Sequence, residues 1–233
     1  MSPHTTPTTP ATTVPAAKEP VDLRCYLVTS GADRHTVETA AAAAGAGAGI
    51  VQVRAKDLDA RPLLALTEEV AAAVRHAAPA CRVVLDDRTD VAYAARRRGA
   101  HVHGVHLGQD DLPVADARAL LGPDAIIGLT TGTTELVEAA ETDADLLDYI
   151  GAGPFRPTPT KAHIRPALGL QGYEELVGLT RLPIVAIGDV TPEDVPALAA
   201  TGVAGVALVR AIMRAEEPAA VVQAVNGAFP VER

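Results

Sequence analysis

The sequence predicts an α/β protein with a single (β/α)8 TIM barrel, and three observations lead to this fold class. Eight short runs rich in Val, Ile and Leu alternate with stretches of helical length. Such runs, flanked by Gly, Pro or charge, are typical of buried parallel strands. Eight strand–helix units within roughly 210 residues fit a compact barrel. Residues 30–33, after the first run, lack the GxGxxG pattern that an open doubly wound sheet leads one to expect.

The elements can be assigned in chain order. The predicted strands are 23–28, 50–53, 82–85, 104–107, 125–129, 147–151, 183–187 and 204–209. The predicted helices are 34–46, 60–77, 88–98, 114–121, 133–142, 171–180, 192–200 and 211–227. Two of these helices open with capping signals. Thr191 precedes Pro192 and two acids, and a second capped start begins at Asp87.

The first residues differ in character from the rest of the chain. Residues 1–20 are mainly Thr, Pro and Ala, have no period and offer almost nothing to bury. We therefore predict a disordered N-terminal leader there. No second low-complexity linker follows, so residues 21–233 are predicted to form the barrel.

Composition and charge exclude several classes of protein. The net charge of −9 argues against a protein that coats nucleic acid, whose surface is normally basic. It leaves small anionic ligands open, because a site can be locally positive. No apolar stretch is long enough to cross a membrane, and no signal peptide is visible, so we expect a cytoplasmic protein without a membrane partner. The sequence leaves assembly into a homo-oligomer open.

The core is expected to be aliphatic, because 48% of the residues are hydrophobic but only 3% are aromatic. The two cysteines, Cys25 and Cys81, form no CxxC pair, which argues against a disulfide scaffold or a structural zinc site. Cys25 lies within a predicted strand and is interpreted as a small buried hydrophobe.

Functional residues of such barrels lie at the carboxyl ends of the strands. After the second predicted strand, Gln52, Arg54 and Lys56 alternate, so an extended chain would direct them to one side. Two cations in a barrel mouth are unfavourable unless they meet an anion. The alternative interpretation is a frayed strand end with solvated charges.

Acidic pairs follow the next two strands, at 86–87 and 110–111. Carboxylates at neighbouring strand ends suit a hard cation that takes oxygen ligands and keeps several waters, namely Mg²⁺. The alternative is that these acids cap the helices that follow.

The last three strand ends suggest phosphate binding. No P-loop is present, but Thr158, Thr160 and Lys161 offer hydroxyls and one cation on a proline-rich loop. Loops seven and eight of a barrel often bind a phosphate. The candidates there are Gly188, Asp189, Val209 and Arg210. Together, the strand ends suggest two anionic substrates, one of them a diphosphate clamped by Mg²⁺ and cations.

These segments resemble the thiamine-phosphate synthase family, from about residue 23 to 225. The resemblance rests on six motifs in order: QVRAK at 52–56, DDR at 86–88, GVHLGQDD at 104–111, IGLTT at 127–131, GP at 153–154 with PTPTK at 157–161, and AIG at 186–188. It implies a barrel transferase that joins a hydroxymethylpyrimidine diphosphate to a thiazole phosphate and releases pyrophosphate.

The resemblance also implies roles for individual residues. Gln52, Arg54 and Lys56 would bind the pyrimidine diphosphate, and Asp87 and Asp111 would hold Mg²⁺. Loops seven and eight would cradle the thiazole phosphate. The remaining implied contacts are Thr130 and Lys161 to the diphosphate, and Thr158 and Thr160 beside the thiazole phosphate. Stabilisation of the departing pyrophosphate would fall to Arg54, Lys56 and Lys161.

The chain departs from the family pattern at several positions. Asp86 stands where Asn is usual, and could join the metal shell or contact an N–H donor of the pyrimidine. Gly132 stands where His is frequent, Asp189 where Gly is usual, and Arg210 where Ser is frequent; Arg210 could offset the charge of Asp189. These departures leave two alternatives open: a related thiazole tautomerase or regulatory barrel, and a non-catalytic barrel that binds a phosphorylated ligand.

Three crowded histidines, His101, His103 and His106, invite a zinc interpretation. The first two precede or open a strand, at the barrel bottom or within it, whereas His106 lies nearer the mouth. His106 is therefore interpreted as a structural contact beneath the site.

Overall fold

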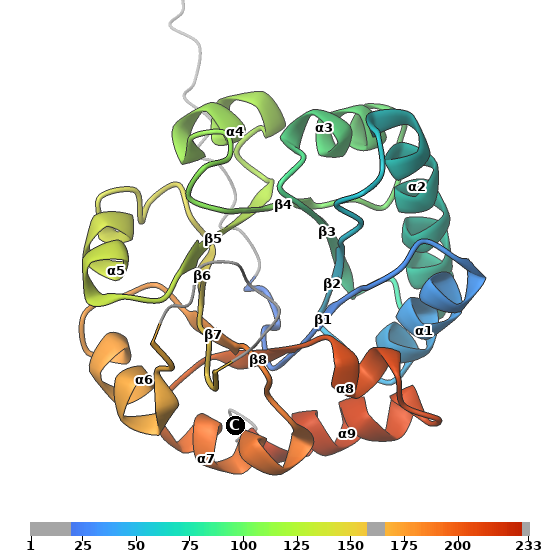
Figure 1. Cartoon of the computed structure of the whole chain (residues 1–233). Helices are drawn as coiled ribbons and strands as arrows, with labels where there is room; N and C mark the ends of the chain where they lie inside the picture. The colour runs from blue at the N-terminus through green and yellow to red at the C-terminus, as the bar shows by residue number, and fades with distance from the viewer. Residues whose placement is uncertain (1–19, 158–165, 230–233) are drawn as a thin grey trace, which may run out of the picture.

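The computed structural model describes residues 20–157 and 166–229. Eight parallel strands close into a barrel in the order β1 to β8, and helices surround it (Figure 1). This confirms the predicted fold class. The strands are β1 (Cys25–Val28), β2 (Ile50–Val53), β3 (Arg82–Asp86), β4 (Gly104–Leu107), β5 (Ile126–Thr131), β6 (Tyr149–Ala152), β7 (Ile184–Ile187) and β8 (Gly205–Leu208). The predicted leader at 1–20 falls almost wholly outside the described residues.

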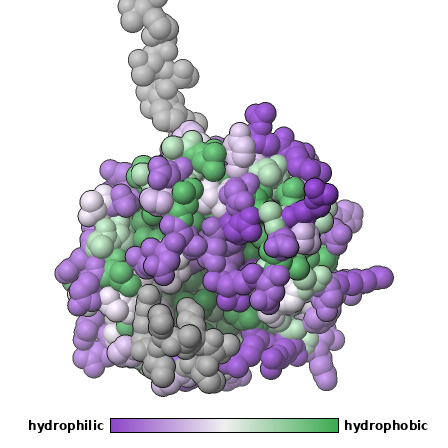
Figure 2. All heavy atoms as spheres, turned by 45° about the horizontal axis from the view of Figure 1, so that its top comes forward, coloured by the Kyte–Doolittle hydropathy of each residue, from purple (hydrophilic) through white to green (hydrophobic). Residues whose placement is uncertain are grey.

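Within the described residues, one helix follows each of the strands β1 to β6, and two helical segments follow each of β7 and β8. They are α1 (Arg34–Gly45), α2 (Ala60–Ala77), α3 (Thr89–Arg97), α4 (Val114–Leu121), α5 (Thr134–Glu141), α6 (Gly169–Val177), η1 (Pro192–Asp194), α7 (Val195–Ala200), α8 (Arg210–Met213) and α9 (Pro218–Ala228). Polar residues cover most of the face drawn in Figure 2. Among the described residues, no helix is long and apolar enough to cross a membrane.

Two helix predictions were wrong in detail. The predicted helix 211–227 is two helices, α8 and α9, and Pro218 is the first residue of the second. The residue before a proline is disfavoured in the helical conformation, which explains the break. The predicted cap at Asp87 is also absent: Arg88 is the N-cap residue and makes no side-chain capping bond. At Thr191, by contrast, the capping box with Asp194 is present.

Side chains of each strand alternate between two cores. Cys25 and Leu27 face outward and pack in the layer between the strands and the helices, whereas Tyr26 and Val28 face into the barrel. Burial raises the pKa of the Cys25 thiol to about 12, as expected for a small buried hydrophobe. The inner cluster is Leu23, Tyr26, Val28, Ile50, Val84, Ile126, Tyr149, Val185 and Ala207. The barrel is therefore a packed core, with the site at its rim.

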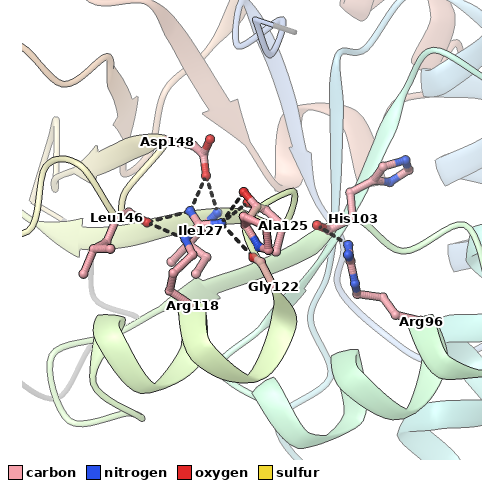
Figure 3. A network of polar contacts seen from close by, with 9 residues as sticks. Arg96, His103, Arg118, Gly122, Ala125, Ile127, Leu146 and Asp148 are labelled. Atoms are coloured by element: carbon pink, nitrogen blue, oxygen red, sulfur yellow. Dashed lines mark hydrogen bonds and ion pairs between the residues drawn. The ribbon is translucent and has the colours of Figure 1, made fainter. Parts of the chain in front are cut away.

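Arg118 of α4 connects the lower ends of β5 and β6, which are their N-terminal ends, through hydrogen bonds (Figure 3). Arg118 donates to the carbonyls of Ala125 and Leu146, each at 2.6 Å, and to Asp148 Oδ2 at 3.1 Å. The same carboxylate oxygen accepts the backbone N–H of Ile127 at 2.8 Å. Arg118 and Asp148 are nearly buried, with 15% and 13% of their side chains exposed. This network sets the positions of the two strands that carry Thr130 and Tyr149 to the interior.

Candidate active site

Two cations stand over two carboxylates where β2 and β3 end. The Nε atom of Arg54 lies 3.2 Å from Oδ2 of Asp86, and Nζ of Lys56 lies 2.8 Å from Oδ2 of Asp87. The cations are about half exposed, at 43% and 54%, whereas the Asp86 side chain is 10% exposed. Arg54 and Lys56 lie just past the end of β2, on the loop. They are therefore free to bend toward a ligand in the mouth.

Burial raises the pKa of Asp86 to about 6. The neighbouring Asp87 carboxylate adds to the rise, and the charges of Arg54 and Lys56 oppose it. The Oδ2 atom of Asp86 is buried and has no hydrogen-bond partner, because the nearby Arg54 Nε is not aligned for one. Asp86 thus presents an unused acceptor to the barrel mouth.

Asp111 brings a third carboxylate to the same place. Its Oδ2 accepts the backbone N–H of Gly108 at 2.6 Å. Burial raises its pKa, the Gly108 N–H lowers it, and the adjacent Asp87 raises it further. Asp87 itself has φ of 60°, a left-handed conformation that Asp tolerates better than most residues. The structure therefore brings Asp86, Asp87 and Asp111 together, as the strand order suggests.

The carboxylates at this edge fit a Mg²⁺ ion that takes some of its ligands from the substrate. Among the described residues, no group of three or more His, Cys, Asp or Glu side chains is arranged to hold a metal by itself. Asp87 and Asp111 offer two hard oxygen ligands next to each other. Mg²⁺ is usually bound by one or two carboxylates, with waters and substrate phosphates filling the other positions.

A chain of hydrogen bonds crosses the barrel interior beneath these charges. Gln52 Nε2 donates to the Tyr26 hydroxyl at 2.8 Å, which lies 2.8 Å from the Tyr149 hydroxyl. The Tyr149 hydroxyl is 3.0 Å from Nδ1 of His106, and Nε2 of His106 is 2.9 Å from Oγ1 of Thr130. These five residues, which we call the inner chain, come from five strands. The sequence reasoning missed Tyr26 and Tyr149.

Every hydrogen in the inner chain has one place in the simplest arrangement. Burial raises the pKa of both tyrosines, so both hydroxyls keep their hydrogens. In this arrangement Gln52 donates to Tyr26, Tyr26 donates to Tyr149, and Tyr149 donates to Nδ1 of His106. Nε2–H of His106 then donates to Thr130. His106 is accordingly neutral in this arrangement and lies beneath the mouth, where the sequence placed it.

Gly128 makes room for this chain. A Cβ atom added at Gly128 would lie 2.2 Å from Cζ of Tyr149 and 2.6 Å from Nδ1 of His106. The two rings stack with centroids 5.5 Å apart. The glycine of the IGLTT motif is thus explained by the close approach of an aromatic ring.

The other two histidines lie at the opposite end of the barrel. Nε2 of His101 lies 3.0 Å from the carbonyl of Cys81, and Nδ1 of His103 accepts the backbone N–H of Val83. Burial lowers the pKa of His103 to about 4, so it stays neutral near pH 7. These contacts join neighbouring backbone segments, and a zinc role has no support among the described residues.

The ends of β7 and β8 carry a second pair of opposite charges. Nη2 of Arg210 donates to Oδ1 of Asp189 at 2.5 Å, and Val209 precedes Arg210 at the start of α8. Asp189 has φ of 57° and the preceding Gly188 has φ of 109°. The predicted offset of Asp189 by Arg210 is therefore present as an ion pair.

Part of the predicted site cannot be placed. Thr158, Thr160 and Lys161 lie outside the described residues. Nearby, Arg156 donates to Asp194 at 2.6 Å and to the carbonyl of Asp189 at 3.2 Å. Gly132 has φ of 139°, and a Cβ there would lie 2.3 Å from the carbonyl oxygen of Gly153. A side chain at 132 would therefore need the backbone to move.

The fold and these strand ends define a (β/α)8 barrel whose mouth is equipped for anionic ligands. Residues 25–212 match the protein family described as thiamine monophosphate synthase. The chain belongs to this family, and the curated relatives are thiamine-phosphate synthases, which are transferases.

Individual relatives cover most of the chain. The thiamine-phosphate synthase of Corynebacterium efficiens is 61% identical over 198 residues, which are 84% of this chain and 90% of the relative. That of Corynebacterium jeikeium is 60% identical over 209 residues, covering 90% and 95%. Among solved structures, thiamine phosphate pyrophosphorylase from Pyrococcus furiosus matches with a TM-score of 0.76 and 28% identity, covering 89% of this chain and 96% of that one.

Proposed function

We propose that this chain condenses 4-amino-2-methyl-5-hydroxymethylpyrimidine diphosphate with 4-methyl-5-(2-hydroxyethyl)thiazole phosphate, or its carboxylated form. The products are thiamine phosphate and pyrophosphate. The observation that carries the proposal is the placement of two half-exposed cations beside three carboxylates at one edge of the mouth. This edge can bind a diphosphate, and family membership supplies the reaction.

The diphosphate would leave from the edge formed by β2, β3 and β4. Arg54 and Lys56 now pair with Asp86 and Asp87, and would turn their remaining donors to the phosphate oxygens. Asp87 and Asp111 would hold Mg²⁺, which supplies positive charge for the leaving group when bound. Lys161 is proposed as a third cation. Preorganised charges of this kind stabilise negative charge as it develops on a leaving group.

The pyrimidine ring would lie above the inner chain. Asp86 Oδ2, which lacks a hydrogen-bond donor, would accept an N–H of the aminopyrimidine. Gln52 is 4% exposed and its side-chain amide is hydrogen-bonded to Tyr26. Only a small part of its side chain is therefore open to contact with the ring. As the C–O bond to the diphosphate breaks, the methylene carbon becomes cation-like and the thiazole nitrogen attacks it with its lone pair. No general base is needed, so positioning and charge stabilisation supply the catalysis.

The thiazole phosphate would lie across the mouth, at loops seven and eight. Gly188, Asp189, Val209 and Arg210 frame this position, and Thr158 and Thr160 are proposed to contact the same phosphate. Barrels of this type frequently bind a phosphate at these two loops.

A coupled assay tests the proposal. Purified protein is incubated with both phosphorylated substrates and Mg²⁺, and thiamine phosphate is measured by chromatography. We expect product that requires both substrates and disappears with a chelator. No product from protein with a native circular dichroism spectrum would refute the synthase function. Isomerisation of the thiazole without condensation would favour the tautomerase alternative, and binding without turnover the non-catalytic barrel. A cytoplasmic location and a homo-oligomeric state stay predictions.

A further inference from the structure

The ion pair between Asp189 and Arg210 has an unusual backbone beneath it. The φ of 57° at Asp189 lies in the left-handed region, which glycine occupies at least cost. Asp and Asn tolerate this region better than other residues, yet the carboxylate brings a negative charge to the two loops where a phosphate would bind. The side chain at 189 therefore needs a reason beyond turn geometry.

The charges around the pair show which cation is available to a ligand. Arg156 is already engaged, because its guanidinium bonds the carboxylate of Asp194 and the carbonyl of Asp189. Asp194 also accepts the backbone N–H and the hydroxyl of Thr191. Arg210 bonds only Asp189 among the described residues, through Nη2. Its side chain is 49% exposed and that of Asp189 is 43% exposed, so both can move.

We propose that Asp189 sets the phosphate affinity of this niche, because it occupies Arg210 until a doubly charged phosphate monoester takes its place. This inference rests on the proposed function. The carboxylate neutralises Arg210 in the free protein, so the niche at the ends of β7 and β8 attracts anions less than Arg210 alone would. A phosphate dianion carries more charge and more acceptor oxygens than the carboxylate, and competes for the same guanidinium. Asp189 then turns toward solvent.

The pair thus weakens phosphate binding. An internal competitor lowers the affinity of every ligand that uses Arg210, by the same factor for each. Ligands that bind without Arg210 are unaffected. The unphosphorylated thiazole alcohol is such a ligand and serves as the internal reference.

Calorimetric titration tests this with four proteins: the native chain, Asp189→Gly, Arg210→Ala and the double variant. The probes are the thiazole phosphate, its alcohol and inorganic phosphate. We expect Asp189→Gly to bind thiazole phosphate about fivefold more tightly, the upper range for an exposed ion pair. Arg210→Ala should bind about tenfold more weakly. The double variant should match Arg210→Ala, because Asp189 acts through Arg210.

Three results distinguish the outcomes. Unchanged or weaker binding by Asp189→Gly, in protein with a native circular dichroism spectrum, would overturn the inference, and product formation by the native chain would leave the proposed function intact. Tighter binding of the alcohol as well as the phosphate would also overturn it. If no thiamine phosphate forms, the proposed function fails, and the inorganic phosphate titration still decides the role of Asp189. Glycine relaxes the backbone at this position, so Asp189→Gly is expected to fold.

Discussion

The two ends of the barrel hold arginine–aspartate pairs that differ in how fully their donors are used. At the end away from the mouth, Arg118 donates hydrogen bonds from Nε, Nη1 and Nη2 to carbonyl groups and to Asp148. At the mouth, Arg54 lies beside Asp86 without an aligned hydrogen bond, and Asp86 keeps a buried acceptor without a donor. A pair whose donors and acceptors are all hydrogen-bonded holds the scaffold in place. A pair with unused donors and acceptors can still form hydrogen bonds with a ligand.

Arg118→Met should have the largest effect on stability. The substitution removes the guanidinium that donates to Asp148 and to carbonyls at the lower ends of β5 and β6, while Asp148 keeps the backbone N–H of Ile127. Removing one partner of a buried pair costs about 3–5 kcal/mol, and urea unfolding should show a loss of this size. Arg181→Met is the control, since Arg181 is 63% exposed and solvent screens its ion pairs, so its loss of stability should be much the smaller. Equal losses in the two variants would contradict the assignment of Arg118 to the scaffold.

Lys56→Gln should show the opposite behaviour. Lys56 is 54% exposed, so its ion pair with Asp87 should change the unfolding free energy by less than about 1 kcal/mol. Turnover in the coupled assay should fall at least about 100-fold, the range for loss of one charge-stabilising donor. Near-native turnover would remove Lys56 from the site.

Asp86→Asn should stabilise the protein at neutral pH. The pKa of Asp86 is raised to about 6 from 3.8, so the folded state binds the proton more tightly than the unfolded state. Stability is therefore lost as pH rises from about 4 to about 6. The variant should gain on the order of 2–3 kcal/mol at pH 7 in urea unfolding, and the gain should shrink toward pH 4. A gain that does not vary with pH would show that ionisation is not its cause.

The turnover of Asp86→Asn also tests whether the Asp86 carboxylate takes part in the reaction. An amide keeps the acceptor oxygen and adds donors. Higher turnover would show that the carboxylate hinders the reaction, and lower turnover would show that its charge is used there.

Tyr149→Phe should have a smaller effect on stability than Arg118→Met or Asp86→Asn. The ring and its packing remain, but the bonds to Tyr26 and His106 are lost, which should cost about 1–2 kcal/mol. Thermal unfolding measures this loss. Tyr93→Phe, at an exposed position on α3, should unfold like the native chain and serves as the control. A larger loss for Tyr93→Phe than for Tyr149→Phe would contradict the role of the inner chain.

Much of the fold was predictable because each strand of a parallel barrel is buried on both faces and therefore consists of a short aliphatic run. The break between α8 and α9 was missed, although Pro218 marks it in the sequence. At the mouth, Asp87 and Asp111 could be paired because they follow neighbouring strands. The inner chain could not be predicted in the same way. Tyr26 and Tyr149 are 123 residues apart, and only barrel closure and strand stagger bring their hydroxyls together.

The direction of the inner chain has a consequence for what the mouth can recognise. When Nε2 of His106 carries the ring hydrogen, His106 donates to Thr130 and the hydroxyl hydrogen of Thr130 is left for a ligand. When Nδ1 carries it, Thr130 donates to Nε2 and offers a ligand only its lone pairs. The tautomer of a buried histidine therefore decides whether the mouth presents a donor or an acceptor at Thr130.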